Sequence, residues 1–306
     1  MYKPLFLALL IAICSTHITA QKQPSASKPT TIPFRITPYN NIIIRVVVNK
    51  LDTLHLMLHT ASSDITLTEE ALTKIRTVKF NGTVDSVKSW GGNDNTADYS
   101  VNNNVAINDL NWENITIWKD KNSGKESDGK IGLNLFGHKS IEFDFDKNQL
   151  VIGSKLPRKV KKFSKLKLTS KDDNLFITGT LQTDHTAIEN KFLIHSGYSG
   201  TILLDDEFVK NNMLDQKIKI TDRKKLKDAF GNVLSVEKGL LPAFKISGFR
   251  MQSVPAGFFA GAVGRQKMSV LGGDMLKRFN FIIDADKTFI YLRPSHFFNT
   301  PFSTDS

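Results

Sequence analysis

Two histidines stand at the centre of the same local pattern in different parts of the chain. His59 lies within "LMLHTASSDITL" and His195 lies within "FLIHSGYSGTIL". In each stretch apolar residues precede the histidine, a hydroxyl residue and a small residue follow it, and a strand-like apolar run comes next. An imidazole with an unperturbed pKa of about 6.5 can act as an acid, a base or a metal ligand. The elements around the two histidines decide which of these roles is open to them.

A second pair of segments repeats in the same order after the histidines. Residues 131–152, "IGLNLFGHKSIEFDFDKNQLVI", align without a gap to residues 271–292, "LGGDMLKRFNFIIDADKTFIYL". The alignment pairs Gly132 with Gly272, and both segments run from an apolar–Gly element through a short helix to a hairpin. Each half therefore places a histidine turn before the same glycine and hairpin, which predicts an internal duplication.

The remaining sequence of each half is typical of short β-strands. β-Branched runs before His59 are broken by the turn-forming stretches "YNN" and "NKLD". Helical patterns are short and follow the two histidine turns, as "TEEALTKI" and "DDEFVKNN". We therefore expect a mainly β, two-lobed protein with short helices and pseudo-twofold symmetry. The expected segments are a signal peptide (1–20), an N-terminal linker (21–31), a first lobe (32–153), a basic linker (154–172), a second lobe (173–294) and a C-terminal tail (295–306).

The first 20 residues are typical of a secretory signal peptide. Lys3 gives a basic start, an apolar run of about ten residues follows, and the small residue Ala20 ends the segment. The run is too short to span a bilayer comfortably, which favours a cleaved signal peptide. An uncleaved membrane anchor is the alternative. Bulky Ile13 disfavours a lipid attached at Cys14, the single cysteine of the chain. We expect a secreted or periplasmic protein with no disulfide, and no transmembrane span after cleavage.

The chain of 306 residues carries a formal charge of +11, much of it in two basic runs. The runs are "KLPRKVKKFSKLK" (155–167) and "DRKKLK" (222–227). No zinc-finger, helix–turn–helix or RNA-binding signature accompanies them, so we expect a solvated basic surface and no nucleic-acid partner. Binding of anionic envelope polymers to the first run is the alternative.

The motifs together resemble those of the aspartic proteases, in particular the secreted, two-lobed retropepsin-like proteases of bacteria. Each lobe of that family has an apolar–apolar–Asp–Thr/Ser–Gly–x–Ser turn and a later apolar–apolar–Gly segment. This chain has "LMLHTASS" with "KIGL" and "FLIHSGYSG" with "VLGG". The resemblance covers roughly residues 32–294 and implies a pepsin/retropepsin-like acid protease fold. Two lobes on one chain also imply a monomer, because the single-lobe relatives dimerise.

The chain departs from the family at the catalytic positions. His59 and His195 stand where the resemblance places the two catalytic aspartates. Ala61 replaces the glycine of the first turn, whereas the second turn keeps Gly197, and Lys130 replaces an apolar residue in "KIGL". The aspartate dyad needs an anionic base beside a protonated acid, and two neutral imidazoles supply no anion. We therefore expect a catalytically inactive pseudoprotease.

The supporting loops implied by the resemblance are retained. The hydroxyls of Thr60 and Ser196 would bond across the lobe interface, and Ser62 would bond the side chain of the first histidine. Gly132 and Gly272 would let another backbone segment pass close by. We expect the fold to survive, and the interlobe cleft to bind a peptide or protein without any cofactor.

Other roles for the histidine pair stay open. An active aspartic-type endopeptidase would need other catalytic groups, and a metal-assisted hydrolase would need at least a third ligand. His55 is no candidate ligand, because four positions along a strand separate it from His59 by roughly 13 Å. A pH-sensitive switch would protonate both rings at about pH 6, whereas polar fillers of a dead site would need only water and backbone partners. No metal is assigned from the sequence.

One aromatic residue is a candidate for lining the cleft. Trp90, in "SWGGND", lies where the flap of the first lobe or its neighbourhood is expected. Its indole would line a groove that binds a peptide as an added strand. The alternative is an aromatic side chain that packs within the sheet.

Overall fold

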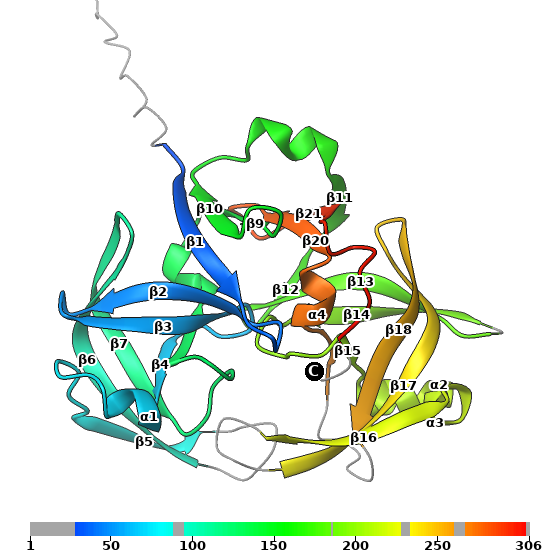
Figure 1. Ribbon diagram of the computed structural model, residues 1–306, viewed down its shortest axis with the longest axis horizontal. Helices are drawn as coiled ribbons and strands as arrows, with labels where there is room; N and C mark the ends of the chain where they lie inside the picture. Colours follow the sequence, from blue (N-terminus) through cyan, green and yellow to red (C-terminus); the bar gives the residue numbers. More distant parts are fainter. Residues whose placement is uncertain (1–27, 88–94, 185, 228–232, 260–266, 304–306) are drawn as a thin grey trace, which may run out of the picture.

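The first half of the chain folds into a closed β-barrel. The computed structural model describes residues 28–303 except 88–94, 185, 228–232 and 260–266. The elements of this half are β1 (Thr30–Ile36), β2 (Ile42–Val48), β3 (Asp52–His59), β4 (Ile65–Thr68), α1 (Glu69–Leu72), β5 (Gly82–Val87), β6 (Asn95–Ile107), β7 (Leu110–Asp120), β8 (Gly129–Gly132), the 3-10 helix η1 (Leu133–Phe136), β9 (Ser140–Asp144) and β10 (Gln149–Gly153). The barrel has the strand order β2-β3-β8-β4-β7-β6, a β2–β6 pairing closes it, and β5 extends it (Figure 1).

The second half repeats this barrel strand for strand. Its elements are the 3-10 helix η2 (Arg158–Lys162), β11 (Ser164–Lys167), β12 (Thr169–Lys171), β13 (Asn174–Gln182), β14 (Ala187–Ile194), β15 (Ile202–Leu203), α2 (Asp206–Asn212), α3 (Leu214–Lys217), β16 (Ile220–Lys227), β17 (Val233–Ile246), β18 (Phe249–Phe259), β19 (Ser269–Leu271), α4 (Gly273–Leu276), β20 (Phe279–Ile283) and β21 (Phe289–Pro294). The order is β13-β14-β19-β15-β18-β17, closed by β13–β17, with β16 added. This correspondence confirms the expected mainly β fold with internal duplication.

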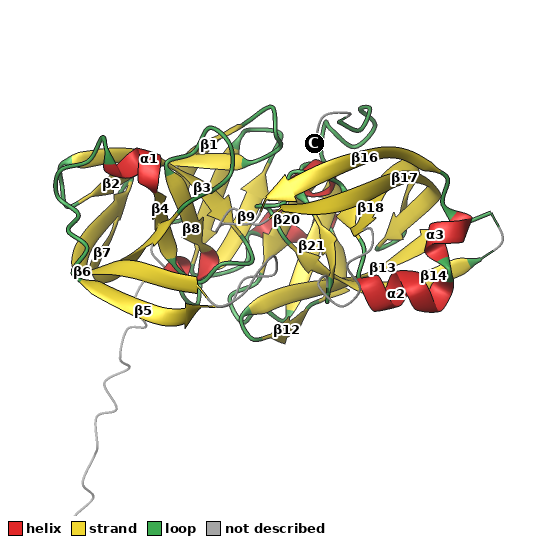
Figure 2. Cartoon of the chain, turned by 90° about the horizontal axis from the view of Figure 1, so that it is seen from below, coloured by secondary structure: helices red, strands yellow, loops and turns green. Residues whose placement is uncertain are grey.

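A central sheet joins the two barrels. Its order, β11-β21-β20-β9-β10-β1, takes hairpins from both halves (Figures 1 and 2). At the β9–β20 pairing Phe143 lies opposite Phe281, and Ile141 lies opposite Ile283. The gapless repeat alignment matches Ile141 to Phe281 and Phe143 to Ile283, so the pairing is symmetric about its middle residues. The pseudo-twofold relation between the halves therefore passes through this sheet.

The segment expected to be a basic linker contributes strands to both sheets. Residues 154–172 contain η2, then β11, which pairs with β21, and β12, which pairs with β13. Leu168, between the two strands, is buried in the core, whereas Lys161 and Lys167 are exposed. The segment thus ties the central sheet to the second barrel, and its Lys159 pairs with the buried carboxylates of Glu142 and Asp144.

Alternation along the two central strands sets the direction of the histidines. Leu56 and Leu58 on β3 are fully buried in the apolar core, as is Ile194 at the end of β14. Successive side chains of a strand point to opposite faces, so His59 and His195 point away from the core.

Among the described residues, no helix is both long and apolar enough to traverse a bilayer.

Short helices follow both histidine turns, where the sequence indicated helical patterns. Thr68 caps α1 by accepting a hydrogen bond from the backbone N–H of Ala71. Asp205 caps α2 by accepting from the backbone N–H of Phe208 at 2.7 Å. Such caps satisfy N–H groups that lack partners in the first turn of a helix.

The C-terminal segment returns to the body of the protein after β21. The side chain of Arg278 is almost fully buried and donates hydrogen bonds to four backbone carbonyls of this C-terminal segment. Ser303 donates its backbone N–H to the buried carboxylate of Asp274 at 2.9 Å. The expected tail is therefore anchored as far as residue 303.

Candidate functional site

The structure brings the two histidines together at the junction of the lobes. His59 ends β3, and His195 directly follows β14. Their ring centroids lie 4.5 Å apart with an angle of 58° between the ring planes. Both side chains are partly exposed. Two turns with the same local sequence thus meet face to face.

Reciprocal hydrogen bonds between the neighbouring hydroxyl residues hold the two turns in place. Thr60 donates its hydroxyl to the carbonyl of Ile194 at 2.6 Å, and Ser196 donates its hydroxyl to the carbonyl of Leu58 at 2.5 Å. Each hydroxyl oxygen also accepts the backbone N–H of the other residue at 3.0 Å. Thr60 and Ser196 are buried, so these four bonds fix the geometry of the pair.

The turns engage the same ring nitrogen of both histidines. The backbone N–H of Ala61 donates to Nδ1 of His59 at 3.2 Å, and that of Tyr198 donates to Nδ1 of His195 at 3.0 Å. A nitrogen that accepts a hydrogen bond carries no proton, so each neutral ring carries its proton on Nε2. The hydrogen bonds therefore assign the Nε2–H tautomer to both imidazoles.

Burial and neighbouring positive charge keep the pair neutral. Burial, with a smaller contribution from the ammonium group of Lys130, lowers the pKa of His195 to about 4. Burial lowers the pKa of His59 well below its usual value, and positive charge on His195 and on Lys130 acts in the same direction. The switch hypothesis required protonation of both rings at about pH 6. The lowered pKa values place protonation of the pair at a more acidic pH.

Close backbone packing surrounds the pair. A Cβ on Gly132 would lie 2.1 Å from the carbonyl oxygen of Ser62, and one on Gly272 would lie 2.1 Å from that of Gly200. A Cβ on Gly197 would lie 2.4 Å from Nε2 of His59, so this edge of the ring packs against the second turn. These three positions leave no room for a side chain.

Ala61 and Ser62 differ in how they fit the first turn. Ala61 is not among the described non-glycine residues with positive φ, so its side chain adds no backbone strain. The bond from Ser62 to His59, expected from the resemblance, is not the one observed. The Ser62 hydroxyl donates to the carbonyl of Asp64 at 3.5 Å, and the backbone N–H of Ser62 closes the turn onto the His59 carbonyl.

An ion pair that the sequence did not reveal lies beside His59. Lys130 on β8 is aligned with Met57 of the parallel strand β3, and therefore shares the face of His59. Its Nζ atom lies 2.7 Å from Oδ2 of Asp120, and both side chains are largely buried. The sequence showed that Lys130 replaces an apolar residue of the family motif. Asp120 could not be identified as its partner, because no periodic pattern relates the two positions.

The His195 side of the site is apolar instead. Leu193, Leu203, Val236, Phe259 and Val270 form a small buried cluster against which Tyr198 and Ala61 pack. In the repeat alignment Val270 takes the place of Lys130. The two lobes therefore present a charged side and an apolar side to the same pair of rings.

The donor set does not match a metal centre. Within the described part of the chain, no three ligating side chains cluster where they would hold an ion. A ring nitrogen must offer its lone pair to a metal, and the lone pairs at Nδ1 are already taken by backbone N–H groups. The arrangement can donate hydrogen bonds more readily than it can ligate.

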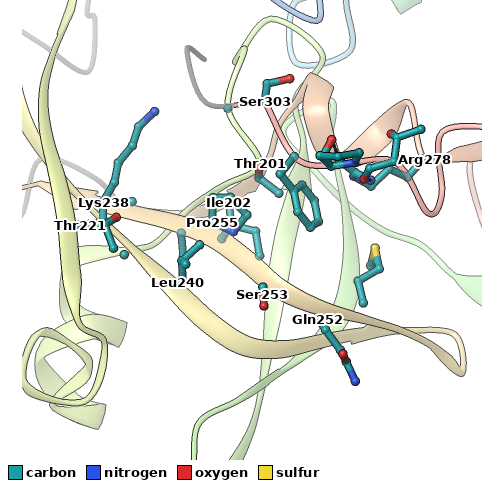
Figure 3. A pocket seen from close by; sticks show the side chains of 18 of the residues that line it. Thr201, Ile202, Thr221, Lys238, Leu240, Gln252, Ser253, Pro255, Arg278 and Ser303 are labelled. Atoms are coloured by element: carbon teal, nitrogen blue, oxygen red, sulfur yellow. Dashed lines mark hydrogen bonds between the residues drawn. The ribbon is translucent and has the colours of Figure 1, made fainter.

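A cavity of about 760 Å³ opens beside the second turn rather than around the histidines (Figure 3). Tyr198 and Thr201 of that turn line it, together with Leu240, Pro255 and Ser303. Neither histidine contributes to its wall. Trp90, the candidate from the sequence for lining a groove, lies outside the described residues, between β5 and β6.

Comparison with known proteins identifies the fold. No protein-family model matches the chain, and no curated protein matches it. The crystal structure of an aspartic proteinase from Irpex lacteus is similar with a TM-score of 0.57 and 14% sequence identity. The match covers 89% of this chain and 99% of that chain. The chain therefore has the two-lobed fold of the pepsin-like aspartic proteinases.

Proposed function

We propose that this protein is a secreted, catalytically inactive relative of the aspartic proteases that binds a peptide or protein segment between its lobes. The observation that carries the proposal is the pair formed by His59 and His195. The pair sits on two hydrogen-bonded turns of a pepsin-like fold, with ring centroids 4.5 Å apart and no carboxylate at either position.

The geometry supports inactivity because a general base needs an unprotonated atom within reach of the water that it activates. The unprotonated nitrogen of each ring is Nδ1, which accepts a backbone N–H from its own turn. The remaining nitrogen, Nε2, already carries a proton. Neither His59 nor His195 is therefore arranged to take a proton from water, and neither provides the negative charge that the family's mechanism requires.

The competing functions receive less support from the site. A metal-assisted hydrolase would have to release the Nδ1 bonds or deprotonate Nε2, and no third ligand lies near the pair among the described residues. An aspartic-type endopeptidase would have to recruit carboxylates from elsewhere. Asp120 is close to the site but is committed to Lys130 at 2.7 Å.

Peptide binding is the part of the proposal that needs no catalytic group. In each barrel a long hairpin, β5–β6 or β16–β17, extends on the side of the protein where the lobes face one another (Figure 1). Strand edges of this kind bind extended peptides by main-chain hydrogen bonding. We expect the bound segment to be retained rather than cut.

The test combines digestion with binding. Purified protein lacking residues 1–20 is incubated with denatured casein and with a peptide library over a range of pH, with and without pepstatin and EDTA. We expect no cleavage, and retention of a subset of peptides. The His59→Asp/His195→Asp variant is the matched comparison, because it restores carboxylates on the same turns. Cleavage by the wild-type protein that disappears in a His59→Asn/His195→Asn variant would overturn the proposal.

Export is a separate part of the proposal. It rests on the N-terminal segment, whose basic start and apolar run are typical of a signal peptide. N-terminal sequencing of protein recovered outside the cytoplasm of a bacterial host should place the first residue at Gln21. Recovery of the intact N-terminus from the membrane fraction would instead identify an uncleaved anchor.

A further inference from the structure

The two histidines offer unused hydrogen-bond donors at the lobe junction. Each Nδ1 is engaged by its own turn, and no hydrogen bond to either Nε2 exists among the described residues. Both histidine side chains are partly exposed, so water can reach the rings. His59 and His195 thus present two N–H groups from opposite lobes, with ring centroids 4.5 Å apart.

The pair has charged neighbours on one side, where Lys130 forms its ion pair with Asp120. Lys130 on β8 shares the face of the sheet that carries His59, and its positive charge acts on both imidazoles. The equivalent position in the second lobe is Val270, which is buried and apolar. The neighbouring titratable groups are Lys130 on β8, Asp120 on β7, Asp64 on the loop after β3 and Tyr198 on the second turn.

We propose that the histidine pair binds a carboxylate, the C-terminal carboxylate of a peptide, through the two Nε2–H groups. The inference rests on the proposed function and names the chemistry of its ligand. An ionised carboxylate has two acceptor oxygens and no donor, which complements two N–H groups presented from opposite lobes. Hydrogen bonds with one ionised partner are roughly twice as strong as neutral ones.

The same pair of positions would repel such a ligand if it carried aspartates. Replacing two carboxylates by two neutral donors removes that repulsion. A bound carboxylate also stabilises imidazolium, so binding raises the pKa of His59 and His195. Carboxylate binding therefore takes up protons below neutral pH and tightens as the pH falls from 7 toward 5.

Two amide substitutions test the roles of Nδ1 and Nε2 of each ring separately. In a His59→Asn/His195→Asn variant, the side-chain oxygen replaces Nδ1 as the acceptor for the backbone N–H, while the donor at the Nε2 position is lost. In a His59→Gln/His195→Gln variant, the longer side chain carries an amide N–H toward the Nε2 position. We expect the asparagine pair to lose the ligand and the glutamine pair to retain part of the binding.

The experiment uses N-acetyl-trialanine as the free acid and as the C-terminal amide. A third probe, the amide of N-acetyl-Ala-Glu-Ala, distinguishes a side-chain carboxylate from a terminal one. Histidine ¹⁵N spectra of the wild-type protein report the tautomer of each ring and its response to each probe. We expect Nε2–H tautomers in the free protein, and about tenfold tighter binding of the free acid than of either amide.

The outcomes separate this inference from the proposed function. Equal binding of acid and amide at the lobe junction would sink the carboxylate assignment and leave peptide binding intact. Preferential binding of the glutamate-containing amide would also sink it, because the ligand would then be a side chain. An Nδ1–H tautomer in either ring, or unchanged affinity in the asparagine pair, would remove its structural basis. If casein is cleaved through the histidines, the proposed function falls independently.

Discussion

Thr60 and Ser196 exchange hydrogen bonds in both directions across the boundary between the lobes. Each hydroxyl donates to a carbonyl at the end of the opposite strand and accepts the backbone N–H of the other residue. Because both residues are buried, water cannot replace a lost partner without cost. The relationship makes the histidine turns one rigid unit made of two distant segments.

Removing one hydroxyl should destabilise that unit. Thr60→Val keeps the side-chain shape but leaves the Ile194 carbonyl and the Ser196 N–H without their partner, which should cost about 1–3 kcal/mol of unfolding free energy. Urea denaturation measures the change. Thr83→Val is the control, because Thr83 makes an exposed hydroxyl bond to Asp98. Equal stability of the two variants would contradict the importance of the crossed bonds.

Gly197→Ala tests the contact between the second turn and the ring of His59. The new Cβ would lie 2.4 Å from Nε2, so the ring must shift, at a cost of about 1–3 kcal/mol. The same substitution in a His59→Ala background should cost much less, because the ring is absent. A double-mutant cycle by urea denaturation gives the coupling energy. Additive effects would show that the ring does not pack against this turn.

The lowered histidine pKa values predict a specific dependence of stability on pH. Unfolding returns both imidazoles to a pKa of about 6.5, above the value of about 4 for His195 and above the depressed value for His59. Between these values the unfolded chain binds more protons, so the free energy of unfolding should fall as the pH falls from about 6.5 toward 4.

The control for this dependence is the His59→Asn/His195→Asn variant, which keeps polar side chains but cannot take up these protons. Urea midpoints at several pH values should show a shallower acid destabilisation in the variant than in the wild-type protein. Identical profiles would mean that the two histidines titrate alike in the folded and unfolded chains.

Lys130→Met should leave Asp120 as a largely buried charge without its ion-pair partner. Breaking such a pair from one side commonly costs about 3–5 kcal/mol, and the partial exposure of Lys130 should bring the cost toward the lower end. The Lys130→Met/Asp120→Asn variant removes both charges and should recover much of the loss. A double variant less stable than Lys130→Met would argue that the pair is not the source of the effect.

Much of the fold follows from repetition in the sequence. The gapless match of residues 131–152 to 271–292 pairs β8, β9 and β10 with β19, β20 and β21, and these strands take equivalent places in the structure. The role of residues 154–172 was less accessible, because a charged segment with few apolar residues gives little sign that β11 will join a sheet. Its pairing with β21 depends on contacts with the far end of the chain.

At the site, the sequence placed the histidines on equivalent turns, but it did not reveal the tautomer of their rings. The tautomer depends on which nitrogen meets the N–H of Ala61 or Tyr198, and this depends on turn geometry. The partner of Lys130 was also hidden, since Asp120 reaches it through pairing of β4 with both β7 and β8. Tertiary contacts of this kind leave no periodic pattern.

The most direct measurement of the central claim is the rate at which the wild-type protein cleaves denatured casein between about pH 4 and pH 7, beside the His59→Asn/His195→Asn variant. The pH range extends from the neutral pair down to the pH at which His195 is about half protonated. We predict that the two proteins show the same background rate at every pH, because neither presents a base to water. Cleavage by the wild-type protein that is lost in the variant would contradict the account.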